Sequence, residues 1–303
     1  MSETTPLVSA IMPTYNGAAF VGETIESVLG QTYERLELVV VDDASSDGTR
    51  EVVASYAEQN PGRIALVRGD EQLGPCRRRN DAIDRSSGDL IAWIDQDDLW
   101  LPDKTELQVE LLRQRPEVGL VYSGYEAFDS ETGKTIPWRD RNSEAEGEVL
   151  VPLFERGCFV AAPTALFRRD VLTRRNLRLR ETDFSFGDDY FLWLTLSLDW
   201  QVARIDTVLA RYRRHGANES ARLAETNFHE TRIALLREFL ATFPEAGPRL
   251  GEHRRKGLAQ QHLKAAGFER SHGRRWSAAG HFARAIALAP GQALRALRPG
   301  AQT

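Results

Sequence analysis

The first hundred residues alternate between short apolar runs and segments with helical spacing of apolar positions. Apolar runs occupy residues 7–12, 36–41, 64–67 and 90–94. Runs of this length without helical spacing predict strands that are buried on both faces. The segments between them predict helices near residues 20–29, 49–59 and 77–86. Strands that alternate with single helices predict right-handed crossovers and a doubly wound, mostly parallel sheet flanked by helices.

The remainder of the chain has a different pattern. It predicts an amphipathic helix to about residue 114, a strand at 118–122, a polar, mobile or exposed excursion at 129–148, and a strand near 163–169 that leads into a short helix. An apolar helix then opens at residues 188 and 189, and the tail from about residue 221 predicts helices at 228–240, 257–267 and 276–288. We therefore expect a catalytic domain over residues 1–220, with a ligand-binding part (1–103) and a second part (104–220). A helical appendage would follow over residues 221–303.

Composition narrows the class of protein. The 303 residues are 27% charged and 42% hydrophobic, which is ordinary for a globular protein, and the two cysteines cannot build a disulfide framework or a cysteine metal site. The first six residues do not form a signal peptide, and no apolar run reaches the roughly 18 to 20 residues that a bilayer requires. We therefore expect a soluble, cytoplasmic protein.

The net charge is unevenly distributed along the chain. From Gly251 onward ten Lys or Arg residues face two Glu residues, a balance of +8, whereas the whole chain carries −5. This asymmetry fits two interpretations: a surface that meets an anionic partner, such as the inner face of a membrane, or the solvated face of ordinary helices. Four histidines in this tail (253, 262, 272 and 281) have no metal-site spacing, and we expect them at the surface.

Carboxylates follow the predicted strand at 90–94. Asp95, Asp97 and Asp98 lie within four positions, and the ends of parallel strands are where open sheets bind ligands. Carboxylates that crowd together need a cation, and oxygen ligands suit Mg2+ or Mn2+ shared with substrate phosphates. The alternative is a simple Asp-rich turn in which Asp98 caps the following helix.

Two other strand ends would meet at the same edge, and their residues fit a nucleotide. Asp43 is able to accept a hydrogen bond from a base imide, and Tyr15 is able to pack against the ring. Neither residue is specific, because Tyr15 also suits a turn and Asp42 or Asp47 suits a helix cap. The first strand end lacks the G-x-G-x-x-G pattern of dinucleotide-binding folds, and the chain has no P-loop.

Three segments in order carry a family resemblance. These are V-S-A-I-M-P-T-Y-N-G at 8–17, L-E-L-V-V-V-D-D-A-S-S-D-G-T at 36–49 and G-D-L-I-A-W-I-D-Q-D-D at 88–98. Together with Arg79-Asn80 and the segment 100–104, they resemble the family-2 nucleotide-sugar glycosyltransferases, over about the first 220 residues. The resemblance implies the GT-A fold, an α/β fold with a Rossmann-like, mostly parallel sheet, here followed by the helical appendage.

The resemblance also implies roles for individual residues at the sheet edge. Asp43 would bind the base, Asp97 would bind the metal directly, and Asp95 would contact the ribose or act through another group. Arg79 occupies a position where the family often contacts the donor, although a salt bridge on a helix surface explains it equally well. The remaining donor-binding positions implied are Pro13, Thr14 and Tyr15.

A second pair of acids opens the apolar helix at residue 188. Asp188 and Asp189 resemble the family's Glu-Asp motif, whose aspartate is the general base. The resemblance aligns Asp189 with that base, but the first acid is also Asp here, so Asp188 is the alternative. The structural alternative is two acids favoured by the helix dipole. Downstream, His215 lies in a segment similar to the family's Tyr-Arg-x-His, where histidine completes the metal and diphosphate site, and the neighbouring arginines at 211, 213 and 214 are natural phosphate partners.

These features predict an inverting, metal-dependent glycosyltransferase that uses Mn2+ or Mg2+ and a nucleotide-diphosphate sugar, with uridine as the expected nucleoside. The acceptor would be a carbohydrate or a lipid-linked glycan of a bacterial surface polysaccharide or glycoconjugate. Two alternatives remain open: a silent sugar-nucleotide binding module and a nucleotidyltransferase of related architecture. No nucleic-acid partner is expected, peripheral membrane contact through the basic tail is one hypothesis, and dimerisation through the tail is equally open.

Overall fold

The computed structural model describes residues 5–136, 145–179, 187–216, 218 and 226–296. The chain divides into two compact units. Unit 1 contains residues 1–147, 160–188 and 200–215, and unit 2 contains residues 148–159, 189–199 and 216–303. The predicted division of function at residue 220 stays a prediction, because compactness alone assigns no function to either part.

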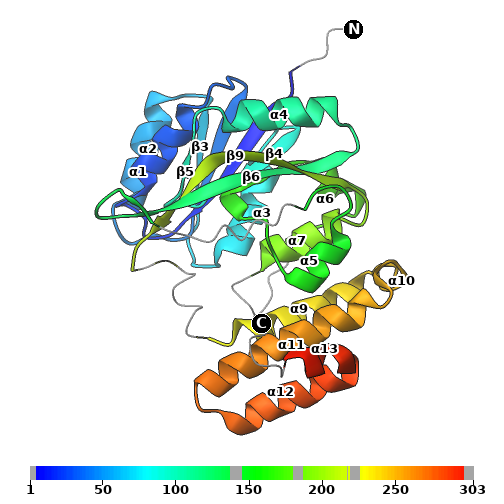
Figure 1. Cartoon of the computed structure of the whole chain (residues 1–303). Coiled ribbons are helices and arrows are strands. Elements are labelled where there is room, and N and C mark those ends of the chain that lie inside the picture. The colour runs from blue at the N-terminus through cyan, green and yellow to red at the C-terminus, as the bar shows by residue number, and fades with distance from the viewer. Residues whose placement is uncertain (1–4, 137–144, 180–186, 217, 219–225, 297–303) are drawn as a thin grey trace. The chain divides into compact units, whose positions relative to one another are not determined.

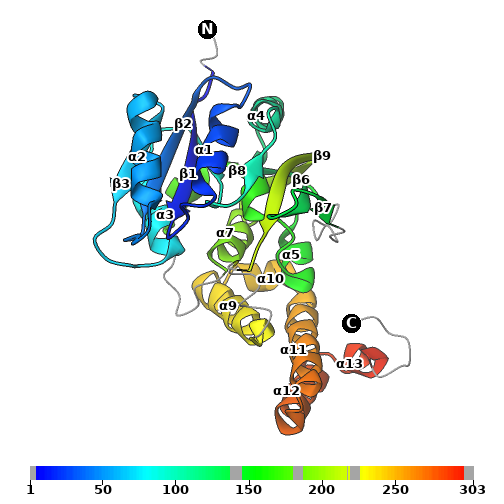
Figure 2. The same cartoon turned by 90° about the vertical axis from the view of Figure 1, so that its left-hand side faces the viewer.

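Unit 1 is built on a sheet whose first half is parallel. Its strands are β1 (Val8–Thr14), β2 (Leu36–Asp42), β3 (Ile64–Arg68) and β4 (Leu90–Trp93), in the spatial order β3-β2-β1-β4. The connecting helices are α1 (Val21–Leu29), α2 (Thr49–Gln59) and α3 (Pro75–Arg85). The order reverses at β1, so right-handed crossovers place α1 and α2 on one face and α3 on the other (Figures 1 and 2). The doubly wound arrangement predicted from the sequence is confirmed.

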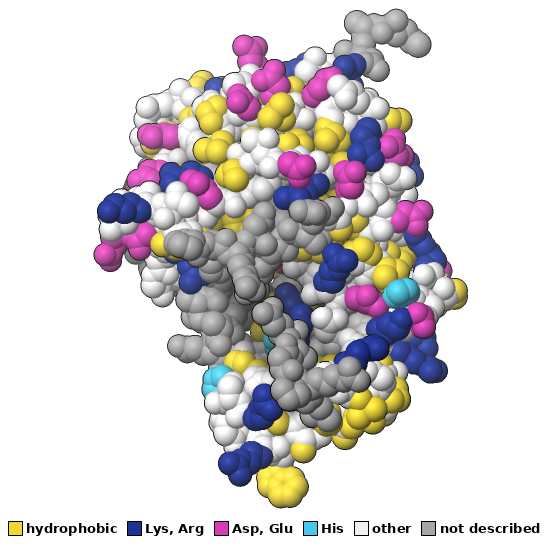
Figure 3. All heavy atoms as spheres, viewed as in Figure 1, with side chains coloured by type: hydrophobic (Ala, Val, Ile, Leu, Met, Phe, Trp, Pro, Cys, Tyr) yellow, Lys and Arg dark blue, Asp and Glu magenta, His cyan; other side chains and the backbone are white. Residues whose placement is uncertain are grey.

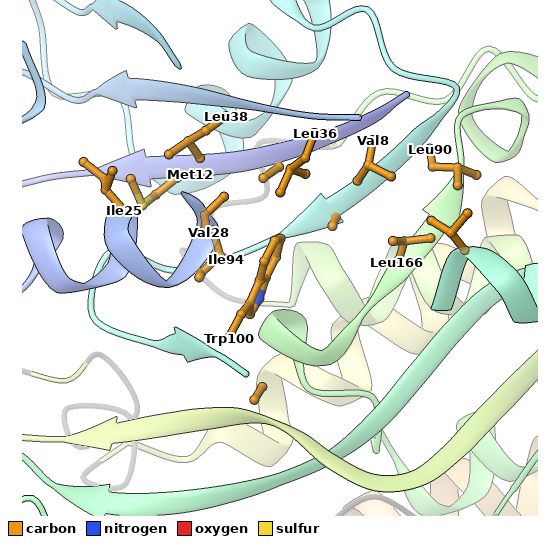
Figure 4. Close-up of a cluster of buried hydrophobic side chains, with 14 of the residues drawn as sticks. Val8, Met12, Ile25, Val28, Leu36, Leu38, Leu90, Ile94, Trp100 and Leu166 are labelled. Carbon is orange, nitrogen blue, oxygen red and sulfur yellow. The ribbon is translucent and has the colours of Figure 1, made fainter. Parts of the chain in front are cut away.

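The core of unit 1 lies between this sheet and its helices. Met12 of β1 and Leu38 of β2 lie beside Ile25 and Val28 of α1, and Trp100 extends the same cluster (Figure 4). These five side chains are at most 3% exposed. Burying a side chain of this size stabilises a fold by roughly 1.5–3 kcal/mol. The sheet edge that carries the predicted site therefore rests on a rigid support.

The second half of the sheet is mixed. Its strands are β8 (Leu166–Arg168), β6 (Val118–Asp129), β9 (Gln201–Arg214) and β5 (Leu99–Trp100), with β7 (Thr135–Ile136) paired to β6. The other elements of unit 1 are α4 (Lys104–Gln114), the short 3-10 helix η1 (Ala162–Thr164) and α6 (Asp170–Arg174). The pair β6–β9 is parallel, whereas β8 is antiparallel to both β4 and β6. The predicted fold class, a mostly parallel α/β sheet with C-terminal helices, is confirmed. Within the predicted polar excursion, residues 137–144 lie outside the described part.

Unit 2 is helical. It contains α5 (Leu150–Arg156), α7 (Asp188–Leu196) from Asp189 onward, α9 (Phe228–Thr242), α10 (Ala246–Leu250), α11 (His253–Ser271), α12 (Arg275–Leu288) and α13 (Pro290–Ala296). Phe239 of α9 is fully buried, with ring centroids 6.5 Å from Phe154 of α5 and 6.1 Å from Phe191 of α7. These contacts join segments that are far apart in the sequence into one helical core.

The prediction that the tail histidines lie at the surface is wrong for His262 and His281. They are 2% and 4% exposed, and their Nδ1 atoms are 2.9 Å apart between the packed helices α11 and α12. His281 also contacts Glu230 of α9 through Nε2, at 2.8 Å. Burial, followed by the neighbouring His281, lowers the pKa of His262 to about 4. Spacing along one helix did not reveal this pair, because its two members come from different helices.

Among the helices that the structure describes, none has the length and apolar composition needed to cross a bilayer.

Candidate active site

The three carboxylates after β4 have different environments. Asp98 is completely buried, and its Oδ1 accepts the backbone N–H of Arg213 at 3.0 Å. Burial, reinforced by the charges of Asp97 and Asp95, raises the pKa of Asp98 well above its ordinary value. The alternative that Asp98 caps the next helix is wrong, since α4 begins only at Lys104 and Asp98 instead ties the end of β4 to β9.

Asp95 is held by Arg79, which comes from α3. Nη2 of Arg79 donates to Oδ1 of Asp95 at 2.7 Å, and Nη1 donates to Oδ2 of Asp188 at 2.8 Å. The guanidinium also lies 4.8 Å from the ring centroid of the fully buried Trp93. The interpretation of Arg79 as a helix-surface salt bridge is wrong, because the residue is 7% exposed and bridges two predicted site residues.

Asp97 faces His215, which follows the end of β9. Oδ2 of Asp97 and Nε2 of His215 are 2.9 Å apart, although 118 positions separate the two residues. The imidazole packs against Phe20 with ring centroids 4.5 Å apart. Arg213 fixes the same strand end, because its Nε donates to the Asp97 carbonyl at 2.8 Å. The structure thus brings together the two residues that the sequence predicted as metal ligands.

The side chains of Asp97 and His215 meet the requirements of a divalent cation in part. Within the described residues there is no group of three or more His, Cys, Asp or Glu side chains that would hold a metal by themselves. Mn2+ and Mg2+ are commonly bound by one or two carboxylates together with substrate phosphates, and imidazole is also a suitable ligand for several transition metals. A carboxylate oxygen and an imidazole nitrogen that meet at 2.9 Å fit such an incomplete site. Asp97 and His215 would hold the ion, and a bound diphosphate would supply further oxygen ligands.

The end of β1 carries Pro13, Thr14 and Tyr15. Pro13 and Thr14 are buried in the strand, whereas Tyr15 is 40% exposed. Gln96, the middle residue of the Asp95–Asp97 segment, accepts the N–H of Tyr15 at 2.8 Å and donates to its carbonyl at 3.0 Å. The β1 and β4 ends are therefore joined by one side chain, which fixes the backbone beside the predicted metal ligands.

The end of β2 carries Asp43, which is 3% exposed. Its carboxylate accepts the backbone N–H groups of Leu73 and Gly74, at 2.7 and 2.8 Å, and the Nε of Arg78 at 2.7 Å. A carboxylate offers about four acceptor positions. Three are accounted for by these contacts, which leaves capacity for one donor such as a base imide.

Asp188 and Asp189 are the first two residues of α7. They follow Gly187, whose φ of +100° is a backbone conformation that favours glycine. Asp188, with a side chain 12% exposed, is bound to Arg79. In unit 2, Asp189 accepts the N–H of Tyr190 at 2.6 Å, and its Oδ2 lies 3.9 Å from Sγ of Cys158. Adjacent acids thus have different partners.

Comparison with known proteins gives the family. The family model described as Glycosyl transferase family 2 matches residues 9–175, which is more than half of the chain. The chain belongs to this family. It is 30% identical over 211 residues to the UDP-Glc:alpha-D-GlcNAc-diphosphoundecaprenol beta-1,3-glucosyltransferase WfgD of Escherichia coli, a match that covers 68% of this chain and 77% of WfgD.

Solved structures support the fold of this glycosyltransferase. The 1–349 fragment of S. aureus TarS in complex with UDP-GlcNAc superposes with a TM-score of 0.68 at 17% identity, over 95% of this chain and 82% of the fragment. The mannosyltransferase PcManGT of Pyrobaculum calidifontis, in complex with GDP-Man and Mn2+, gives a TM-score of 0.62 at 22% identity, over 98% of this chain and 82% of its own. At these identities the likeness shows the fold alone.

Several residues that shape the candidate site of this glycosyltransferase were not predicted to do so. Gln96 joins two strand ends, Arg78 holds Asp43, and Arg213 had been considered only as a phosphate partner although it is 4% exposed and bound to the Asp97 backbone. For Arg78 the sequence offered one indication, because it directly precedes Arg79, which was predicted to contact the donor. No signal in the sequence pointed to the pairing of Gln96 with Tyr15.

Proposed function

We propose that this glycosyltransferase is an inverting, metal-dependent enzyme that transfers a sugar from a UDP-sugar to an acceptor hydroxyl. The observation that carries the proposal is the contact of Asp97, just after β4, with His215, which follows the distant strand β9. A carboxylate and an imidazole in contact beside a predicted nucleotide site fit the binding of a metal diphosphate.

The donor would lie along the carboxyl ends of β1, β2 and β4. Asp43 would accept the imide N–H of uracil with its remaining acceptor position, and the half-exposed Tyr15 would pack against the base. Pro13 and Thr14 would shape the strand end, and Asp95 would contact the ribose. UDP is favoured over other nucleotides because the name of WfgD specifies UDP-Glc as donor.

The reaction would be a single displacement with inversion. The acceptor oxygen attacks the anomeric carbon and forms the new glycosidic bond while its proton passes to a carboxylate, for which Asp189 and Asp188 are the candidates. The bond between the anomeric carbon and the diphosphate oxygen breaks at the same time, and its electron pair leaves with UDP. A divalent ion, when bound, would stabilise the negative charge that develops on the diphosphate.

The acceptor would be a lipid-linked glycan used in bacterial surface polysaccharide synthesis. This part of the proposal is supported by WfgD, whose name specifies a diphosphoundecaprenol acceptor. Such an acceptor is anchored in a membrane, so the enzyme has to work at the membrane surface.

The donor and metal proposals are tested by thermal stabilisation. A ligand that binds only the folded state stabilises it by mass action, by about 2.7 kcal/mol at a ligand concentration of one hundred times Kd. This stabilisation raises the melting temperature. We expect a shift with UDP and Mn2+ that EDTA removes and that Asp97→Ala abolishes. GDP and TDP serve as controls for the base. The absence of a shift with any nucleotide would contradict the donor site and favour a silent module.

The C-terminal helices of unit 2 supply a candidate surface for peripheral membrane contact. Trp276 is 91% exposed, Ile286 is 39% exposed and Leu294 is 60% exposed. Arg275 and Arg284 are exposed on the same helix, α12. Lys, Arg and apolar side chains are interspersed over the visible surface of α11–α13 (Figure 3). A helix that exposes tryptophan between cations suits the interface of an anionic bilayer.

Vesicle sedimentation at low salt tests this surface. We expect binding to vesicles that contain phosphatidylglycerol but not to pure phosphatidylcholine, and Trp276→Ser is expected to weaken it. Lack of binding to either vesicle would refute membrane contact. A dimer in light scattering that dissociates in Trp276→Ser would instead assign the surface to a second copy of the chain.

A further inference from the structure

A pocket of about 290 Å³ lies in unit 2, where the start of α11 meets the end of α12 and the short helix α13. Its polar lining consists of Glu252, Arg255, Lys256, Gln292 and Arg295, and the bend between α12 and α13 (residues 288–291) completes it. The helix α13 packs on α11 and α12 (Figure 1) through three completely buried alanines, Ala259, Ala285 and Ala293. The shape of the pocket is therefore fixed by packed helices.

The charge of this pocket is positive. Arg255, Lys256 and Arg295 line it together with a single carboxylate, that of Glu252. Nζ of Lys256 donates to Oε1 of Glu252, which leaves two of the three ammonium donors. Among the described residues, the guanidinium groups of Arg255 and Arg295 contact no carboxylate. A pocket with this surplus of cations favours an anion, and planar guanidinium groups match the oxygens of a phosphate.

The cations of α11 also oppose the stability of the helix that carries them. The helix begins at His253, and its first turn contains no acid but the sequence His253-Arg254-Arg255-Lys256. The N-terminus of a helix has a partial positive charge, so acids are stabilising there and cations are not. Residues that break a local rule of this kind are expected at functional positions. An anion bound beside this turn would compensate the unfavourable charges.

Exposed apolar side chains near these cations favour a lipid over a free phosphate. Leu294, which precedes Arg295 on α13, is 60% exposed, and Ile286, near the end of α12, is 39% exposed. Pro290 lines the pocket and is also exposed. A free phosphate would gain nothing from such neighbours, whereas a phospholipid carries acyl chains beside its phosphate.

We propose that this pocket binds the phosphate of an anionic phospholipid headgroup, such as that of phosphatidylglycerol. Arg255 and Arg295 would donate to the phosphate oxygens, and Leu294 would lie against the acyl chains. The inference rests on the membrane contact proposed above and makes it specific. The exposed surface around Trp276 would attract an anionic bilayer in general, whereas the pocket would bind one lipid molecule and so fix the orientation of unit 2 on the membrane.

Monomeric short-chain lipid tests the pocket without a bilayer. The full chain is titrated in a calorimeter with dihexanoyl phosphatidylglycerol below its critical micelle concentration, in the presence of EDTA. We expect binding, and we expect the double variant Arg255→Gln/Arg295→Gln to lose about 10-fold or more in affinity, because hydrogen bonds to charged groups contribute on that scale. Both arginines are exposed, so this variant is expected to keep the melting temperature of the wild type.

A matched control variant carries the same change in net charge. Arg237→Gln/Arg270→Gln removes two exposed arginines of unit 2 that do not line the pocket. At physiological salt its affinity for the short-chain lipid is expected to change less than about 2-fold, since distant exposed charges are screened. Equal losses of affinity in the two double variants would show a general attraction of charge and overturn the pocket.

The source of the phosphate is tested with further probes. Inorganic phosphate and glycerol phosphate stand for free phosphates, and dihexanoyl phosphatidylcholine stands for a lipid without net charge. All three are expected to bind more weakly than dihexanoyl phosphatidylglycerol. Inorganic phosphate that binds as tightly as this lipid would refute the lipid as occupant. Equal binding of the two lipids, or no binding of either, would refute the anion site.

Vesicle sedimentation separates the pocket from the wider membrane contact. If the wild type and Arg255→Gln/Arg295→Gln sediment equally with phosphatidylglycerol vesicles, the membrane contact stands and the pocket is refuted. If short-chain lipid binds through the two arginines but the chain sediments with no vesicle, the pocket stands and the wider contact is refuted. The melting-temperature shift with UDP and Mn2+ is expected to be equal in both double variants, so a failure of the donor site is recognised separately.

Discussion

Lys104 is an ionisable side chain in the core, and its replacement by methionine is expected to stabilise the protein at neutral pH. The side chain is completely buried at the start of α4. Its Nζ donates to Oε1 of Gln108 at 2.7 Å and lies 4.2 Å from the ring centroid of Trp100. These contacts include no carboxylate, and burial lowers the pKa of Lys104 from 10.5 to about 7.

The magnitude and sign follow from the difference between the folded and unfolded pKa values. Between pH 7 and 10.5 the unfolded chain binds the proton more tightly than the folded chain, so this group makes stability rise with pH over that window. Below pH 7 the full penalty applies. At about 1.4 kcal/mol per pKa unit, it is on the order of 5 kcal/mol. Methionine removes this penalty but leaves Oε1 of Gln108 without its donor, a cost of about 1–3 kcal/mol.

We therefore expect Lys104→Met to gain about 2–4 kcal/mol at pH 6–7 and to lose that advantage near pH 10.5. The assay is denaturant unfolding of both proteins at several pH values, with the difference plotted against pH so that titrations common to both cancel. The exposed Lys134 provides the control variant Lys134→Met, for which no such slope is expected. A Lys104→Met protein that is less stable than wild type by the same amount at every pH would refute the argument.

Other predictions concern unit 2 and the site. The helices α11 and α12 are expected to lose stability as pH falls from about 6.5 to about 4, because His262 is held neutral in the fold while the unfolded chain binds a proton. Circular dichroism melts at pH 4–7 measure this loss. His262→Leu should make the melting temperature less dependent on pH in this range. Gly257→Ala should destabilise unit 2 by about 1–3 kcal/mol, since a Cβ there would lie 2.6 Å from Cδ1 and 2.7 Å from the carbonyl oxygen of Phe154. Gly267 lies on the same helix, and a Cβ there meets nothing within 4 Å, so Gly267→Ala is the control in the same unfolding assay. Gln96→Leu should weaken UDP binding, measured by calorimetry, because it releases the backbone of Tyr15, whereas an unchanged affinity would show that the β1 end is fixed by other contacts.

The parallel half of the sheet was predictable because its signals are local. Each strand is a continuous apolar run, and each crossover helix has its own apolar spacing, so β2 and α2 agree with their predicted bounds to within one residue. β9 was not predicted as a strand because arginines interrupt its apolar positions. Arg211 and Arg213 are paired with Glu126 and Glu23 in the structure, and such distant partners are not visible in a single sequence window.

The candidate site was predictable to the extent that its residues follow strand ends. Asp43, Asp95 and Asp97 were found in this way, and the pairing of Asp97 with His215 followed from the family resemblance. The links between these residues could not be predicted, because Gln96, Arg78 and Arg79 act through contacts across the fold. Asp98 illustrates the limit: three neighbouring aspartates look equivalent in sequence, yet one is completely buried and bound to a backbone N–H.

The helical core around Phe239 has a consequence for any attempt to isolate the catalytic part. Phe154 and Phe191 precede residue 220, but they pack on Phe239, which follows it. A chain cut at residue 220 would expose these two aromatic rings and the apolar side of α7, whose first residues are Asp188 and Asp189. The helix that begins with the two proposed catalytic acids thus packs on the tail through Phe191. Proteolytic trimming or a premature stop codon in the tail would be expected to cause aggregation and loss of activity together.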